Sequence, residues 1–222
     1  MTLPAEPTIL HLEAMVQALP AEERALFQRI FRVSSVIGHL SPPASMRPWI
    51  ERHFGGFEEV LEQRIVKVTN QVTLEGALFN WLRARRPIWR NHALVLEREL
   101  EPPEPLDDPY SYTPEDLFGR VEGKYCVTAS NVAKFDGLHA LVIFRERHPL
   151  AFDREMIHDY IDTGQRWAER ARAWDPEAKY YLFLWNCLWR AGASLIHGHA
   201  QIMLGRDTRP MPPWAAPSQR RG

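Results

Sequence analysis

The chain has 222 residues, of which 45% are hydrophobic and 25% charged, and its formal net charge is -1. This composition is that of an ordinary globular protein, and the balanced charge excludes the basic footprint by which many proteins bind nucleic acids. The sequence contains no run near the ~20 apolar residues of a membrane helix, and its N-terminus lacks the apolar core of a secretory signal. Its two cysteines form no CxxC pair. We therefore expect a cytoplasmic protein that binds neither nucleic acid nor membranes.

The first 63 residues are predicted to form a helical region. Apolar residues recur at helical spacing in residues 9–38, and Pro20 divides this run because proline breaks a helix interior. The second of the two helices is expected from Ala21 to Val36. A strand is expected at Arg64–Thr69, where the second region begins.

Residues 64–205 are predicted to form one α+β domain. Alternating and apolar runs indicate four further strands, at 123–130, 137–146, 179–186 and 194–204. A long amphipathic helix is expected at 153–175, with Asp153 as its N-cap. This order of elements predicts an antiparallel sheet with a helix packed on one face. Residues 206–222 are rich in proline and arginine and are expected to form a flexible tail.

The last of these strands carries a row of polar side chains in the stretch GASLIHGHAQ. Because side chains alternate between the two faces of a strand, His197, His199 and Gln201 are expected on one face. Alternate residues lie ~6.6–7 Å apart along a strand, a span that fits a phosphate group. Just before the row, Gly192 allows close backbone approach, and the Ser194 hydroxyl can bond a phosphate oxygen. The row therefore predicts a site for the phosphates of a nucleotide.

The residue types in this row favour group transfer. A lone histidine in a strand is more often a hydrogen-bonded core residue than a catalyst, but that explanation weakens for two histidines and a glutamine in register. A neutral imidazole is a nucleophile toward phosphorus, and a second imidazole can fix its tautomer. The amide of Gln201 can donate to a phosphoryl oxygen without activating water. Transfer to an acceptor is therefore favoured over hydrolysis.

The same residues resemble a known family. GASLIHGHAQ is similar to the His-x-His-x-Gln motif of the nucleotidyltransferase branch of the histidine-triad (HIT-like) superfamily, which includes galactose-1-phosphate uridylyltransferases and diadenosine tetraphosphate phosphorylases. The hydrolase branch carries a third histidine where this chain has Gln201. Asn186 and the stretch ASNVAKFDGLHALVIFRERHPL fit the same pattern, and the resemblance covers residues 115–205.

The resemblance implies a HIT-like α+β fold for residues 64–205 and a covalent nucleotidyl-histidine intermediate. His199 would be the nucleophile, Gln201 would stabilise the phosphoryl oxygens and His197 would support the site. The substrate-binding residues implied in the same way are Asn186, Gly192, Ser194, Asn131 and Asp136. The donor would be a nucleoside diphosphate sugar or a dinucleoside polyphosphate, with uracil or adenine as its base. The acceptor would be phosphate or a sugar phosphate.

Two departures from the family keep alternatives open. Uridylyltransferases of bacterial type bind zinc through a cysteine pair and two histidines that match His148 and His197, whereas the phosphorylases lack this site. Zinc would have to bind this chain without that cysteine pair. In addition, the family's chains continue into another half-domain, and here 21 residues follow Gln201. A nucleotide-binding protein without turnover and a histidine-triad hydrolase are the alternatives, and a homodimer could cover an exposed sheet edge.

Overall fold

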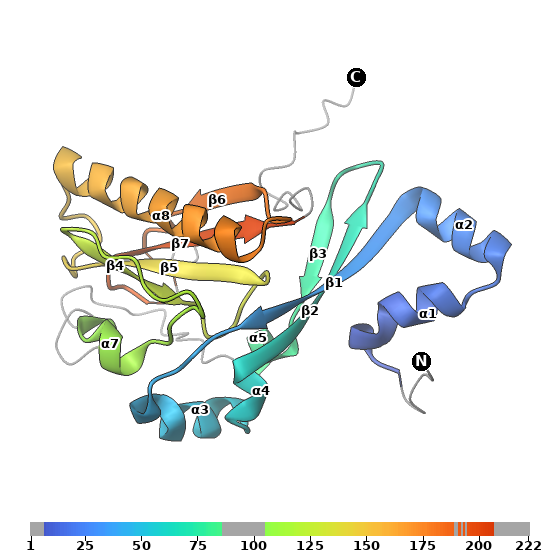
Figure 1. Ribbon diagram of the computed structural model, residues 1–222, viewed down its shortest axis with the longest axis horizontal. Helices are drawn as coiled ribbons and strands as arrows, with labels where there is room; N and C mark the ends of the chain where they lie inside the picture. The colour runs from blue at the N-terminus through green and yellow to red at the C-terminus, as the bar shows by residue number, and fades with distance from the viewer. Residues whose placement is uncertain (1–6, 86–104, 189–190, 192, 194, 207–222) are drawn as a thin grey trace.

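The computed structural model describes residues 7–85, 105–188, 191, 193 and 195–206. Two antiparallel sheets and the helices packed on them make up this part of the chain (Figure 1). The α+β class expected from the sequence, with an antiparallel sheet and packed helices, is therefore confirmed. Most of the expected tail, residues 207–222, lies outside the described residues.

The two sheets contain seven strands in the described part of the chain. The three-stranded sheet has the order β1-β2-β3 and consists of β1 (Phe31–His39), β2 (Glu62–Asn70) and β3 (Gly76–Phe79). The four-stranded sheet has the order β4-β5-β7-β6 and consists of β4 (Cys126–Ser130), β5 (Leu138–Phe144), β6 (Tyr180–Leu184) and β7 (His199–Gly205). All neighbouring strands are antiparallel.

Helices lie on or beside both sheets (Figure 1). The α-helices are α1 (Leu12–Ala18), α2 (Ala21–Ile30), α3 (Arg47–Phe54), α4 (Glu58–Leu61), α5 (Trp81–Arg85), α7 (Pro109–Tyr112) and α8 (Arg154–Trp174). Short 3₁₀ turns are η1 (Ile9–His11), η2 (Ala44–Met46) and η3 (Pro105–Asp107). In the described ranges, none of the helices has the length and apolar character needed to cross a membrane.

The long helix α8 covers one face of the four-stranded sheet (Figure 1). It begins as expected, because the Asp153 side chain caps it by accepting a hydrogen bond from the Met156 N–H. Its buried side chains pack against alternate residues of the strands, among them Ala140, Val142, Phe144, Ala200, Ile202 and Leu204. Burying a large apolar side chain contributes about 1.5–3 kcal/mol, so this interface is a main source of stability. The polar residues of β7, His199 and Gln201, therefore lie on the opposite face of the sheet.

The helix expected from Ala21 to Val36 is wrong in its second half. Helix α2 ends at Ile30, and the next nine residues form β1. They pair with β2 along their whole length, from Phe31 opposite Asn70 to His39 opposite Glu62. Long-range pairing therefore overrides the helical spacing in this segment, where Val33 and Val36 also favour a strand. The region boundary placed at residue 64 falls inside β2.

The other expected strands are present with shifted ends. The strand expected at Arg64–Thr69 is β2, and the runs at 123–130, 137–146 and 179–186 contain β4, β5 and β6. The strand expected from residue 194 is wrong at its start, because β7 begins at His199 and His197 precedes it. Residues 197 and 198 instead lie beside the end of β5 and the residues after it. The Gly198 carbonyl accepts a hydrogen bond from the Phe144 N–H, and the Gly198 N–H donates to the Arg147 carbonyl.

Candidate functional site

His199 is the first residue of β7 and lies opposite Ile143 of β5. Only 8% of the residue is exposed. Its Nδ1 lies 2.8 Å from the carbonyl oxygen of His197, and a carbonyl only accepts, so Nδ1 carries a proton. In the neutral ring the lone pair is then on Nε2, which bonds to none of the described residues. The geometry thus leaves one ring nitrogen of His199 ready to act as a nucleophile.

The burial of His199 supports the same protonation state. Removal from water lowers the pKa of its imidazole, an effect larger than the opposing hydrogen bond to the His197 carbonyl. The nearby His197 ring lowers the His199 pKa further when it is charged. The ring is therefore neutral at physiological pH, the form in which an imidazole attacks phosphorus.

The position between the two histidines has no room for a side chain and is occupied by Gly198. A Cβ at this position would lie 2.7 Å from Cδ2 of Phe144 and 3.0 Å from the carbonyl oxygen of Glu146. The Phe144 ring is itself fixed, because it stacks on Tyr160 with ring centroids 3.8 Å apart. The chain between His197 and His199 can pass this ring only without a side chain.

His197 is buried, and its backbone carbonyl contacts the His199 ring. It is 2% exposed, and its Nε2 donates to the carbonyl oxygen of Phe144 over 2.8 Å. Its Nδ1 has no hydrogen-bond partner in the described part of the chain but lies 3.5 Å from Oδ1 of Asp107, whose other oxygen is paired with Arg147. Burial lowers the His197 pKa more than Asp107 raises it. The His197 ring is held mainly by its hydrogen bond to the Phe144 carbonyl. The backbone carbonyl of His197 in turn orients the His199 ring.

Gln201 is held in one orientation by His139, which was not among the site residues expected from the sequence. The Phe135 N–H donates to Nδ1 of His139 over 2.9 Å, so the His139 proton sits on Nε2. That Nε2 donates to Oε1 of Gln201 over 3.1 Å. The Gln201 amide nitrogen has no partner among the described residues, so both of its hydrogens are available to a ligand. The relay turns Gln201 into a donor of fixed direction.

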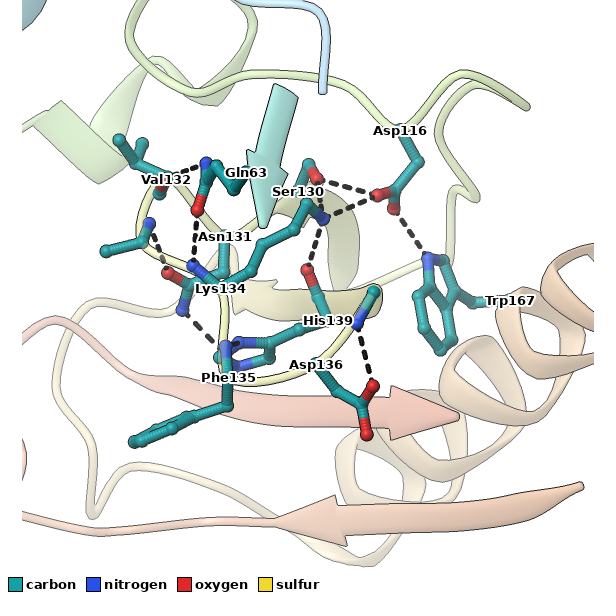
Figure 2. Close-up of polar contacts among 12 residues, drawn as sticks. Gln63, Asp116, Ser130, Asn131, Val132, Lys134, Phe135, Asp136, His139 and Trp167 are labelled. Atoms are coloured by element: carbon teal, nitrogen blue, oxygen red, sulfur yellow. Dashed lines mark hydrogen bonds and ion pairs between the residues drawn. The ribbon is translucent and has the colours of Figure 1, made fainter. Parts of the chain in front are cut away.

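His139 is anchored in turn by a buried lysine (Figure 2). Lys134 is fully buried, and its Nζ donates to the His139 carbonyl over 2.9 Å and to Oγ of Ser130 over 2.6 Å. It also pairs with Asp116 over 3.4 Å, and Asp116 accepts from Nε1 of Trp167 on α8. Burial lowers the Lys134 pKa, yet the three acceptors around Nζ match the three hydrogens of an ammonium group.

Asn131 and Asp136 lie beside this network (Figure 2). Oδ1 of Asn131 accepts from the Ala133 N–H, and its Nδ2 lies 3.4 Å from Nε2 of His139. Asp136 is buried, and its Oδ2 pairs with Lys67 of β2 over 2.8 Å. The Asp136 contact joins the two sheets, so both residues are engaged within the protein.

Asn186 lies two residues beyond the end of β6 and is half-buried. Leu184 is opposite Gln201, so the same register extended by two residues would put Asn186 opposite His199. Asn186 forms no hydrogen bond with the part of the chain that the structure describes. Gly192 and Ser194, expected to hold phosphates, lie outside the described residues.

The zinc ligands implied by the resemblance are not assembled. Within the described ranges, no three His, Cys, Asp or Glu side chains are grouped as a metal ion would need. His148 is engaged locally, since its Nδ1 accepts from the Leu150 N–H. Asp107, beside His197, is already paired with the cationic Arg147, which would repel a metal ion.

The structure thus brings His197, His199 and Gln201 together and adds His139, Lys134 and Asp107. A signal for His139 was present in the sequence, because a histidine alternating with apolar residues in LHALVIF needs a buried partner. Nothing near Lys134 or Asp107 in the sequence marked either of them.

Comparisons with known proteins add a partial structural likeness. No family model matches the sequence, and no curated protein matches it. Among solved structures, the chain is similar to a histidine triad protein from Clostridium difficile, with 14% identity over 40% of this chain and 78% of that chain. The TM-score is 0.33.

Proposed function

We propose that the protein is a nucleotidyltransferase that works through a covalent nucleotidyl-histidine at His199. The observation that carries the proposal is the arrangement of His199 and Gln201 at alternate positions on one face of β7. Nε2 of His199 holds a lone pair, and the Gln201 amide offers two hydrogens in a direction fixed by His139. One group can attack phosphorus while the other bonds the phosphoryl oxygens.

In the first half-reaction, Nε2 of His199 attacks the α-phosphorus of a nucleotide donor. A P–N bond forms and the P–O bond to the leaving phosphate breaks, so the leaving group departs with the electron pair. The imidazole becomes positively charged as it bonds to phosphorus. The hydrogen bond from Nδ1–H to the His197 carbonyl strengthens as this charge develops, which stabilises the transition state.

In the second half-reaction, a phosphate oxygen of the acceptor attacks the same phosphorus from the vacated side. The P–N bond breaks and its electron pair returns to Nε2 of His199. Gln201 donates to the phosphoryl oxygens in both steps, and a neutral amide does not remove a proton from water. The anionic acceptor needs no general base, so this step requires no residue that removes a proton.

The fitting donors are a nucleoside diphosphate sugar and a dinucleoside polyphosphate, and the fitting acceptors are a sugar phosphate and inorganic phosphate. Hydrolysis is the second candidate, because His139 adds a third imidazole to the same face. It is less favoured because His139 is fully buried and both of its ring nitrogens are engaged. Nucleotide binding without turnover is the third.

The test is the intact mass of the protein after incubation with UDP-glucose, ADP-glucose or diadenosine tetraphosphate. We expect a gain of one nucleoside monophosphate that acid removes, and the donor that gives it identifies the base. His199→Ala should form no adduct, while His158→Ala, an exposed histidine on α8, should form it normally.

The acceptor separates the three candidates. Loss of the adduct only when phosphate or a sugar phosphate is added supports transfer. Release of nucleoside monophosphate in water alone would instead establish hydrolysis. Donor binding without any adduct would leave the protein as a nucleotide binder and refute the transfer mechanism.

A further inference from the structure

A cavity lies away from His199, between the two sheets. It has a volume of about 340 Å³, at the lower end of the ~300–1,000 Å³ typical of ligand pockets. Its walls come from β1, the loop before β4, the start of β5, the C-terminal end of α8 and the end of β7. Leu204 lines it from the α8 side of the sheet, whereas His199 and Gln201 lie on the other face. The cavity is therefore separate from the transfer site.

The charges around the cavity are balanced. Its lining includes three carboxylates, and each one is paired with a cation. Asp116 pairs with Lys134 at 3.4 Å, Asp136 with Lys67 at 2.8 Å and Asp175 with Arg206 at 2.8 Å. A ligand with a net charge would add an unpaired charge to this balanced wall, which is costly in a partly buried site. The cavity is therefore suited to a neutral ligand.

The wall offers several hydrogen-bond acceptors. Carboxylate oxygens of Asp136 and Asp175 line it, and each such oxygen can accept more than one hydrogen bond. Helix α8 ends at Trp174, so carbonyl groups of its last turn, which have no partner within the helix, lie at the same end. His39 adds an exposed imidazole that bonds to none of the described residues. A fitting ligand supplies several hydroxyl donors.

The cavity also has an aromatic wall. Trp174 is 54% exposed, although it is a large apolar side chain at the end of a long helix. Its ring centroid lies 6.4 Å from that of Phe118, and both rings line the cavity. Exposed aromatic faces of this kind stack against flat, weakly polar C–H surfaces while polar groups at the rim form hydrogen bonds.

From the balanced charge, the acceptors and the aromatic wall, we infer that this cavity binds a neutral polyhydroxylated ring of monosaccharide size. The hydroxyl groups donate to Asp136 and Asp175, His39 completes the polar contacts, and the C–H face of the ring stacks on Trp174. This inference does not depend on the proposed transfer reaction.

The test uses the full-length protein and three probes that share one ring but differ in charge. These are D-glucose (neutral), D-glucosamine at pH 6.5 (cationic) and D-glucuronate (anionic), with D-galactose and myo-inositol as further neutral probes. Calorimetry and ligand-observed NMR measure each dissociation constant. We expect a neutral probe to bind in the millimolar range, about tenfold more tightly than either charged probe.

Variants locate the binding. Trp174→Ala and His39→Ala should each weaken binding of the neutral probe by about tenfold. Trp49→Ala, a partly exposed tryptophan on α3 outside the cavity, should not change it. His199→Ala should also leave it unchanged, which separates this site from the transfer site.

Three results would overturn the inference. The first is that none of the neutral probes binds at concentrations up to about 50 mM, well above a millimolar dissociation constant. The second is tighter binding of glucosamine or glucuronate than of every neutral probe. The third is undiminished binding in both Trp174→Ala and His39→Ala.

Discussion

Nε2 of His139 donates a hydrogen bond to Oε1 of Gln201 over 3.1 Å, and this contact sets the direction of the Gln201 amide. The two residues are on neighbouring strands, β5 and β7. An amide that was free to rotate could offer phosphoryl oxygens either its hydrogens or its lone pairs. With Oε1 fixed on His139, only the hydrogens are available to the substrate.

Replacing His139 should therefore slow the chemistry more than it weakens binding. We expect His139→Leu to reduce the rate of adduct formation by about 10- to 100-fold, less than the ~10²–10³-fold cost of losing an oxyanion donor outright. Donor affinity should change little. His139→Gln, which keeps an N–H near the same position, should restore part of the rate. Quenching the reaction at set times and measuring the intact mass, over a range of donor concentrations, separates the rate of adduct formation from donor affinity. Equal losses of rate in His139→Leu and His139→Gln would refute the relay.

Gln201 should decide between transfer and hydrolysis. Gln201→Glu keeps the size and the acceptor for His139 but replaces the two donors with a negative charge. Adduct formation should fall by about 10²–10³-fold. Gln201→His introduces a group that can exchange protons with water, so its adduct should be lost without an acceptor. Following the adduct lifetime in buffer checks this, and an unchanged lifetime in Gln201→His would contradict it.

The pH dependence follows from the buried imidazoles. Burial lowers the pKa of His199 below its ordinary value of 6.5, and the nucleophile is the neutral ring. The rate of adduct formation should stay constant from pH 8 to below 6.5 and decline only in more acidic solution. Folding stability should also decline with acid below about pH 6.5, because the unfolded chain binds protons that buried His197 and His199 exclude. A rate that falls by half at or above pH 6.5 would contradict the neutral, buried His199.

Lys134 should be important for stability. Replacing it with methionine leaves the buried carboxylate of Asp116 without its cation, which costs about 3–5 kcal/mol of unfolding free energy. Lys124→Met is the matched control, because Lys124 forms an exposed ion pair with Glu155. Urea denaturation measures both variants. Equal stability of Lys134→Met and Lys124→Met would show that the buried network does not stabilise the fold.

Gly198 should tolerate no side chain. In Gly198→Ala the new Cβ would press on the Phe144 ring and the Glu146 carbonyl, so the turn between the two histidines has to shift. We expect a loss of about 1–3 kcal/mol in stability together with slower adduct formation. Gly56→Ala is a suitable control, because there the neighbour is the flexible side chain of Glu59. Wild-type behaviour of Gly198→Ala in both measurements would refute the tight packing.

Most of the local structure could be predicted from the sequence, because it depends on short-range patterns. The apolar spacing and the Asp153 cap located α8, and alternation located β4, β5 and β6. The segment after Ile30 was predicted incorrectly because β1 is decided by pairing with β2, whose residues are about thirty positions away. Spacing within one segment carries no information about such a partner.

The sequence by itself determined that two histidines and a glutamine lie close together near the end of the chain, since they are separated by single residues. Only the tertiary structure decided which nitrogen of His199 is free and which way Gln201 points. The direction of Gln201 comes from His139, which is 62 positions away along the chain. The free nitrogen of His199 is set by the carbonyl of His197, two residues away, because the turn before β7 places that carbonyl against the ring. Burial, which sets the pKa of the two histidines, likewise exists only once β5 and β7 have paired and the sheet is covered.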